Sequence, residues 1–250
     1  MTQFWSCGGG TQSVAIATLI IQGRLPKPNA SCIVDTGREK QSTWDYFETI
    51  LKPNLAVVGV DLVRVDKDEF ATCDLTSTNG ESILVPAFSD FDDRPSKLPN
   101  WCSNEWKTRV ADRWLRSQGI KETVKWIGFS LDEPKRYLKN LENPLMRFPL
   151  VQDVPMKRHD CRTLIASMGW PAAPRSACWM CPNMHDNEWR EIIANRPSEF
   201  QKAVELEKEL QGHDPHVWLH ASCKPLSDVD FSQPPSLFDE VACDSGNCFI

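Results

Sequence analysis

The chain has 250 residues, of which 41% are hydrophobic and 25% charged, and its net charge at pH 7 is −6. This composition is typical of a globular protein with one large domain, or one domain and a smaller appendage, and it excludes a basic protein that attracts nucleic acid over its whole surface. No apolar run nears the ~20 residues of a membrane span and the N-terminus does not resemble a secretory signal, so we expect a cytoplasmic protein without membrane contact.

The first half of the chain alternates short apolar runs with amphipathic stretches, which predicts alternating strands and helices. The expected strands are 4–6, 30–37, 55–65 and 123–130, and the expected helices are 13–22, 42–52, 105–118 and a segment from 133. Between them, Asn79-Gly80 is a strong β-hairpin signal. Strands that alternate with helices predict an α/β fold with a doubly wound, mostly parallel sheet, which binds ligands at the carboxyl ends of its strands.

The composition changes after about residue 149, where Pro, Cys and Trp become frequent. Two helices are expected here, near 187–194 and 198–211, and a polar, Pro-containing tail follows them. The sequence therefore predicts three regions: an α/β domain over 1–150, a smaller Cys-rich helical region over 151–225 that binds metal, and an extended C-terminal arm over 226–250.

A run of three glycines, Gly8 to Gly10, stands between the first expected strand and the first expected helix. Glycines let backbone N–H groups approach a phosphate closely, and a helix N-terminus favours negative charge. Thr11 and Ser13 add hydroxyl groups to the same turn. The run lacks the Gly-Lys-Ser/Thr of a P-loop ATPase and the spaced glycines of a dinucleotide fingerprint, so a plain glycine turn is the alternative.

Residues 8–13, Gly-Gly-Gly-Thr-Gln-Ser, resemble the PP-loop (commonly Ser-Gly-Gly-x-Asp-Ser) of the adenine nucleotide alpha-hydrolase-like superfamily. That superfamily includes N-type ATP pyrophosphatases, tRNA thiolases and phosphoadenylyl-sulfate (PAPS) reductases. Gly8 stands where the motif has its first Ser, and Gln12 where it has Asp, as in reductase-type loops. Three more stretches follow in the family's order over about residues 1–185: Asp35-Thr36-Gly37-x-Glu39, Cys102 with Lys107, and Glu133 with Arg136.

The resemblance implies that 1–150 is a PP-loop domain that binds ATP or another adenine nucleotide, with Mg²⁺ as a candidate ion. It implies a nucleotide-binding set of Ser6, Gly8, Gly9, Gly10, Thr11, Gln12, Ser13, Asp35, Thr36, Gly37, Glu39 and Arg136. Asp35 and Glu39 would help to hold the ribose, the base or Mg²⁺. Lys107 is the implied catalytic residue of the helix after Cys102, where it would hold an oxyanion.

Ten cysteines in a chain without an export signal predict metal ligands or reactive thiols rather than disulfides. Cys178 and Cys181 form a Cys-x-x-Cys pair, Cys161 lies near them in the sequence, and Cys102 stands where dissimilatory-type sulfonucleotide reductases carry a cluster ligand. Four thiolates suit a four-iron four-sulfur (4Fe–4S) cluster. A four-cysteine zinc site and a redox-active dithiol are the alternatives.

The last two cysteines, Cys243 and Cys248, lie in the expected arm. The resemblance implies a catalytic role, because PAPS reductases attack sulfur with a C-terminal cysteine. One of them as a cluster ligand in place of Cys102 or Cys161, and an inert tail, are the alternatives.

Three functions follow as hypotheses. The first is an iron–sulfur enzyme that activates an acceptor with ATP and transfers sulfur to it. The second is a sulfonucleotide reductase that uses Cys243 or Cys248, and the third is a nucleotide-binding regulatory subunit without catalysis. The expected partners are an adenine nucleotide and a nucleotide or nucleic-acid acceptor, with a sulfur-donor protein and a second copy of the chain as further candidates.

Overall fold

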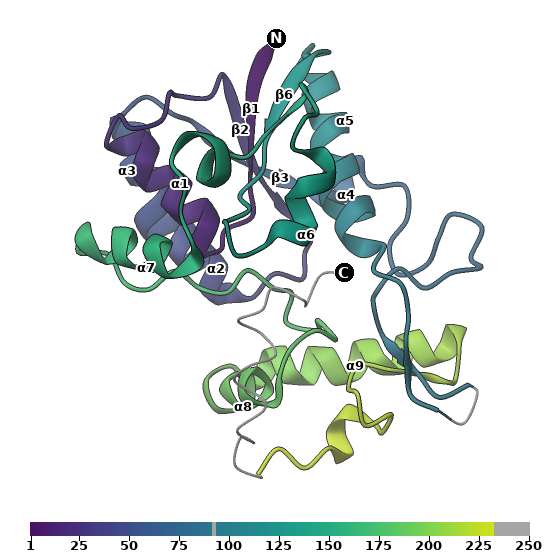
Figure 1. Ribbon diagram of the computed structural model, residues 1–250. Helices are drawn as coiled ribbons and strands as arrows, with labels where there is room; N and C mark the ends of the chain where they lie inside the picture. Colours follow the sequence, from purple (N-terminus) through teal and green to yellow (C-terminus); the bar gives the residue numbers. More distant parts are fainter. Residues whose placement is uncertain (92–93, 233–250) are drawn as a thin grey trace. The chain divides into compact units, whose positions relative to one another are not determined.

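The structure is a computed structural model, and it describes residues 1–91 and 94–232 (Figure 1). The chain forms two compact units. Unit 1 comprises Met1–Phe70 and Val110–Ser176, and unit 2 comprises Ala71–Arg109 and Ala177–Ile250, described up to Ser232. Unit 1 therefore continues past the boundary expected at 150, and the segment 71–109 belongs with the later part of the chain, as the pairing of Phe88 and Ser89 with Trp218 and Val217 shows. Most of the arm expected over 226–250 lies outside the described residues. Within the described ranges, no helix has both the length and the apolar character that a membrane crossing requires.

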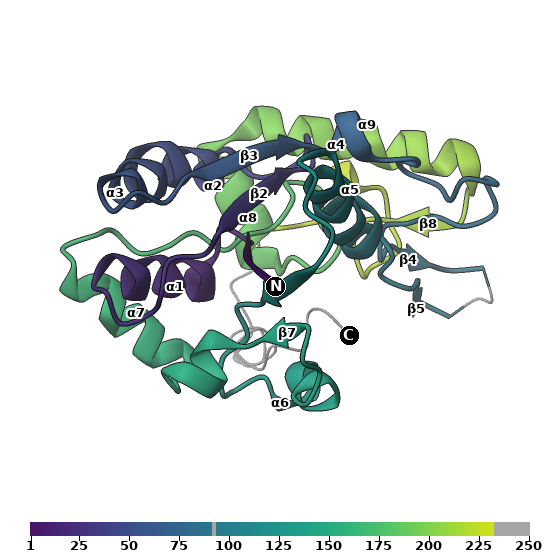
Figure 2. The ribbon, with the colours of Figure 1, turned by 90° about the horizontal axis from the view of Figure 1, so that it is seen from above.

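Unit 1 is built on a parallel sheet of five strands in the order β3-β2-β1-β6-β7 (Figures 1 and 2). The strands are β1 (Thr2–Cys7), β2 (Ala30–Asp35), β3 (Leu62–Asp66), β6 (Thr123–Trp126) and β7 (Met146–Arg147). The chain leaves β1 for β2 on one side and reaches β6 later on the other side. The strand order therefore reverses at β1, and ligands of such sheets bind beside this point.

Helices cover both faces of the sheet. Consecutive strand residues point to opposite faces, so each face presents apolar side chains to its own helices. Trp5 is fully buried in the core that contains α1 (Thr11–Ile21), whereas Phe4 meets Trp114 of α5 (Arg109–Ser117) with ring centroids 6.2 Å apart. The predicted doubly wound α/β class is confirmed. The helical segments of unit 1 are α1 (Thr11–Ile21), α2 (Gln41–Tyr46), η1 (Phe47–Leu51), α3 (Lys52–Val57), α4 (Lys67–Phe70), α5 (Arg109–Ser117), α6 (Pro134–Tyr137), η3 (Leu138–Asn140), η4 (Pro149–Asp153) and α7 (Arg158–Ser167).

The strand expected over 55–65 is shorter than predicted, and its first part is wrong. Leu55 to Val57 end a helical stretch that runs from Gln41 through α2, η1 and α3. Gly59 follows with a φ of +74°, and its N–H donates to the carbonyl of Ala56, which ends the helix. Only Leu62–Asp66 pair as β3. β-branched residues alone do not separate a helix end from a strand, and here the preceding helix continues into them.

Unit 2 combines a small antiparallel sheet with two helices. Its strands pair in the order β5-β4-β8, with bounds β4 (Phe88–Ser89), β5 (Ser96–Lys97) and β8 (Val217–Trp218). Its helical segments are η2 (Ser103–Thr108), α8 (Asp186–Asn195), α9 (Pro197–His213) and η5 (Leu226–Asp228). The two C-terminal helices are thus confirmed. The Glu188 carboxylate accepts the His185 N–H at 3.3 Å to cap α8, and Pro197 begins α9.

Candidate functional site

The turn from β1 to α1 depends on two of its three glycines. Gly9 has a φ of +75°, and a Cβ there would stand 2.8 Å from Cγ2 of Thr43. Gly10 has an ordinary φ, but its Cβ would lie 3.3 Å from Cβ of Ser176. A Cβ on Gly8 would make only an ordinary contact at 3.5 Å. A side chain at position 9 or 10 would therefore crowd Thr43 or Ser176. With glycine at both positions, the loop presents backbone peptide groups instead of side chains.

The N-terminus of α1 is suited to an anion. Gly10 is the N-cap of this 11-residue helix and has no side chain with which to cap it, and the first turn contains no acidic residue. The first N–H groups of a helix have no partner within the helix, and they attract negative charge. The hydroxyl of Ser13 accepts the Gly8 N–H at 2.9 Å and so braces the loop. Near Gly9, the buried Thr43 hydroxyl has no hydrogen-bond partner within residues 1–91 and 94–232. These features fit a phosphate group.

Gln12 is locked against the segment that follows β6. Its Nε2 donates to Oε2 of Glu133 at 3.0 Å and to Oγ of Ser130 at 3.3 Å. The same Oε2 accepts the Ser130 N–H at 3.2 Å and the Ser130 hydroxyl at 3.1 Å. One carboxylate oxygen thus joins the first turn of α1 to the chain beyond β6.

The other oxygen of Glu133 holds two arginines. Nη1 of Arg136 lies 2.6 Å from Oε1, and Nη2 of Arg158 lies 3.7 Å from it. The Arg136 guanidinium also stacks 4.1 Å over the Phe129 ring. The Glu133 side chain is only 2% exposed, whereas the two arginines are 27% and 22% exposed. A buried acid therefore positions two partly exposed cations, an arrangement that suits an anionic ligand.

Asp35 ends β2 and braces the turn that follows it. Its Oδ1 accepts the Gly37 N–H at 2.8 Å, and its Oδ2 accepts Nε of Arg64 at 3.0 Å. Gly37 has a φ of +69° with open space around it, so backbone conformation rather than crowding favours glycine there. Thr36 and Glu39 are buried beside this turn.

The parallel sheet brings most of the predicted nucleotide-binding residues to one edge. Ser6 and the glycine loop lie at the carboxyl end of β1, and Asp35 at that of β2. Arg136 follows β6 and joins the Gln12 network through Glu133. Lys107 is different, because it belongs to η2 of unit 2. Cys243 and Cys248 lie outside the described residues.

Three of the predicted metal ligands share unit 2. Cys102, Cys178 and Cys181 are partly buried and pack against the same hydrophobic core. Burial and the nearby Cys181 raise the pKa of the Cys102 thiol to about 12, and the Lys107 ammonium opposes that rise. The Cys181 N–H donates to the Cys178 carbonyl at 3.1 Å, so the pair lies on one turn. The positive charge of Lys107 thus acts on the Cys102 thiol and favours its thiolate form.

Cys161 belongs to unit 1, where α7 packs on α1. It is fully buried in the hydrophobic core, and burial raises the pKa of its thiol to about 12. Cys7 is similar, with burial raising its pKa to about 12, and burial also raises the pKa of Cys32. These three thiols occupy the positions of small core residues.

The donor set of unit 2 fits a soft metal centre in its chemistry, because three thiols are the ligands that iron–sulfur clusters and zinc prefer. Within the described part of the chain, however, no three His, Cys, Asp or Glu side chains gather as a metal-binding group. The metal ligands therefore stay a prediction.

Ser130, Arg158 and Arg64 contact the two carboxylates of the site but are not in the nucleotide-binding set that the resemblance implies; of the three, Arg158 is the one that the sequence marks, as part of the basic stretch 156–162 that could hold a phosphate. Ser130 and Arg158 contact Glu133, and Arg64 contacts Asp35 across the β2–β3 pair. The Glu133 and Arg136 pair in the sequence indicated that charged partners would gather around Glu133. The strand register that places Arg64 beside Asp35 leaves no mark in the sequence.

No protein-family model matches the chain, and no curated protein matches it. Among solved structures, the chain is similar to the U34-tRNA thiolase NcsA from Methanococcus maripaludis with its 4Fe–4S cluster. The sequence identity is 12% and the TM-score is 0.45, and the match covers 91% of this chain and 72% of that one. The α/β fold class rests on the parallel strand order of unit 1, which is observed in the structure itself.

The Glu133 network gives a stability prediction. In Glu133→Gln, either orientation of the new amide turns its NH₂ toward a donor, Arg136 on one side or Gln12 and Ser130 on the other. We expect the free energy of unfolding to fall by about 1–3 kcal/mol, measured by urea titration. Glu142→Gln makes the same change at an exposed site and should stay within about 0.5 kcal/mol. Equal stability of the two variants would contradict the role of Glu133.

Proposed function

We propose that the chain binds ATP or a related adenine nucleotide at the Gly8–Ser13 loop and uses it to activate an acceptor for sulfur transfer. The observation that supports this most is the uncapped N-terminus of α1, reached through a glycine turn at the carboxyl edge of the parallel sheet. A plain turn would not need two glycines at positions where a side chain would clash, next to a buried Thr43 hydroxyl that has no hydrogen-bond partner among the described residues.

The loop and the Glu133 network would have separate tasks. The backbone N–H groups at the start of α1, with the Thr11 hydroxyl, would bind phosphate oxygens and stabilise the charge that develops on departing pyrophosphate. Arg136 and Arg158, held by Glu133, would neutralise a second anionic group, such as the α-phosphate. Because these donors are fixed before the ligand arrives, they need little reorganisation during the reaction.

The activation step is an attack by a carbonyl oxygen of the acceptor on the α-phosphorus of ATP. A phosphorus–oxygen bond forms, the bond between the α- and β-phosphates breaks, and pyrophosphate leaves. Sulfur at the sulfide level then forms a bond to the activated carbon, the carbon–oxygen bond breaks, and AMP leaves. The acceptor is a nucleotide or a nucleic acid in this proposal.

The three cysteines of unit 2, Cys102, Cys178 and Cys181, are the proposed ligands of a 4Fe–4S cluster. The fourth ligand would be Cys243 or Cys248, since Cys161 is a core residue of unit 1. When bound, such a cluster supplies iron that can hold a sulfur atom or pass electrons. Lys107, coupled to Cys102, would favour the thiolate form that ligation requires.

The ligand proposal predicts which cysteines retain metal. Protein purified without oxygen should contain about four iron and four sulfide per chain. Cys102→Ala, Cys178→Ala and Cys181→Ala should each lose most of both, whereas Cys161→Ala, the same change in unit 1, should retain them. Iron and acid-labile sulfide are assayed chemically, and the visible spectrum is recorded beside them. Cys243→Ala and Cys248→Ala, tested in the same way, identify the fourth ligand. Metal loss in Cys161→Ala alone, or zinc without sulfide, would contradict the proposal.

One observation favours a second function, reduction of a sulfonucleotide such as PAPS. Gln12 replaces the acid of the ATP pyrophosphatase loop, so residues 8–13 offer no carboxylate to Mg²⁺. In this case Arg136 and Lys107 would hold the sulfonucleotide, and Cys243 or Cys248 would attack its sulfur.

The products of turnover separate the two functions. With ATP and a mixture of tRNA, DNA and nucleotides, sulfur transfer predicts pyrophosphate and AMP in equal amounts, only when a sulfide donor and an acceptor are present. With PAPS and a thiol reductant, reduction predicts sulfite, lost when both Cys243 and Cys248 are changed to Ser. Sulfite without pyrophosphate would replace the first proposal with the second. Nucleotide binding without either product would indicate a regulatory subunit.

A further inference from the structure

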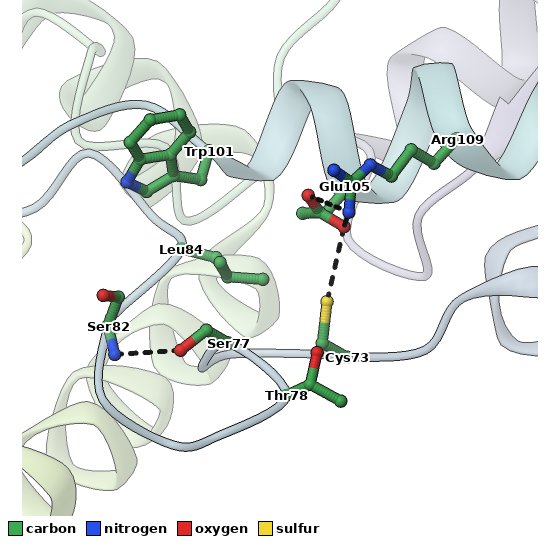
Figure 3. A pocket seen from close by; sticks show the side chains of 8 residues that line it. All are labelled: Cys73, Ser77, Thr78, Ser82, Leu84, Trp101, Glu105 and Arg109. Atoms are coloured by element: carbon green, nitrogen blue, oxygen red, sulfur yellow. Dashed lines mark hydrogen bonds and ion pairs between the residues drawn. The ribbon is translucent and has the colours of Figure 1, made fainter.

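Unit 2 contains a pocket of about 250 Å³ that plays no part in the nucleotide site of unit 1 (Figure 3). It lies between the 75–84 hairpin and the start of η2. Its lining residues are Cys73, Ser77, Thr78, Ser82, Leu84, Trp101, Glu105 and Arg109.

The hairpin gives the pocket a fixed wall. Ser77 exchanges hydrogen bonds with Ser82, from its N–H to the carbonyl at 2.7 Å and from the Ser82 N–H to its hydroxyl at 3.0 Å. The Asn79-Gly80 turn between them, with Gly80 at a φ of +74°, confirms the predicted hairpin. The Leu84 carbonyl accepts the N–H groups of Trp101 and Cys102 at 3.1 and 2.8 Å. Trp101 is therefore positioned by backbone bonds before any ligand binds.

The pocket combines a flat apolar face with a polar edge. The Trp101 side chain is half-exposed, at 50%, although a large aromatic ring is usually buried. One helical turn on, Nη1 of Arg109 pairs with the Glu105 carboxylate at 2.8 Å, and 54% of the Arg109 side chain remains exposed (Figure 3). The Cys73 thiol donates to the same carboxylate at 3.7 Å. Donors, acceptors and an exposed ring thus line one small space.

This combination and the pocket volume select a class of ligand. A ring that stacks beside an arginine and a carboxylate is how proteins hold unpaired nucleobases, which have a π-face and an edge of donors and acceptors. Pockets for drug-sized ligands measure about 300–1,000 Å³, so 250 Å³ suits one heterocycle rather than a whole nucleotide.

We infer that this pocket binds one unpaired nucleobase of the acceptor, with Trp101 stacked on its face and the Glu105–Arg109 pair on its edge. The inference rests on the proposed function, because it names the acceptor group that would receive sulfur. Trp101 directly precedes Cys102, a proposed cluster ligand, and the Leu84 carbonyl fixes both residues. The base pocket and the proposed sulfur chemistry therefore share one segment of unit 2.

The test measures binding of CMP, UMP, GMP and short single-stranded RNA and DNA by calorimetry, with the full chain prepared without oxygen and saturated with ATP. Trp101→Ala should weaken the tightest of these probes about 5- to 150-fold, the effect of losing one stacked base. Trp101→Phe keeps a flat ring and should restore most of the affinity. Phe91→Ala removes another exposed aromatic ring of unit 2, 72% exposed, and should change nothing.

The probes also identify the source of the base, since a preference for RNA, DNA or a mononucleotide appears directly in the affinities. Binding that is unchanged in Trp101→Ala, or no binding of any probe while ATP still binds, would overturn the inference and leave the nucleotide site intact. Base binding that depends on Trp101 in a protein that does not bind ATP would support the pocket and reject the proposed function.

Discussion

The turn between β1 and α1 constrains the rest of the site. Gly9 adopts a left-handed conformation with no room for a side chain, and Gly10, an N-cap without a side chain, then begins α1 at the carboxyl edge of the sheet. Because β2 and β6 run parallel to β1 on either side, the segments after all three strands meet at this edge. Asp35 and Arg136, which are distant in the sequence, are thereby brought to the edge where the loop lies.

Glu133 explains why the loop tolerates Gln12. In this chain a carboxylate already stands next to position 12 and accepts the Gln12 amide at 3.0 Å. An aspartate there would face Glu133 without a proton between them, and two like charges at such a distance are unfavourable. The amide instead joins the network, which leaves Glu133 free to balance Arg136 and Arg158. Gln12 thus completes a network in which one buried carboxylate faces an amide on one side and two arginines on the other.

The sequence predicted the fold well because its signals were local. Alternating strands and helices, the glycine run and the Asn79-Gly80 turn each depend on neighbouring residues. Two kinds of feature could not be predicted from the sequence, because both depend on contacts between distant segments. The contact of Arg64 with Asp35 depends on strand register, and the assignment of Cys161 to one unit and of Cys178 and Cys181 to the other depends on which distant segments fold together. Sixteen residues lie between Cys161 and Cys178 in the chain, yet Cys161 is buried in the core of unit 1 and Cys178 packs against the core of unit 2.

The proposed binding of ATP at the start of α1 can be tested by deleting a single hydroxyl group. Thr11→Val removes a hydroxyl at the first position of the helix and keeps its shape, so Kd for ATP should rise about 10- to 150-fold by calorimetry, as for a hydrogen bond to a charged group. Thr18→Val makes the same change seven residues on, where the hydroxyl bonds the Val14 carbonyl, and should leave Kd unchanged. Equal Kd values for both variants and the wild type would contradict the account.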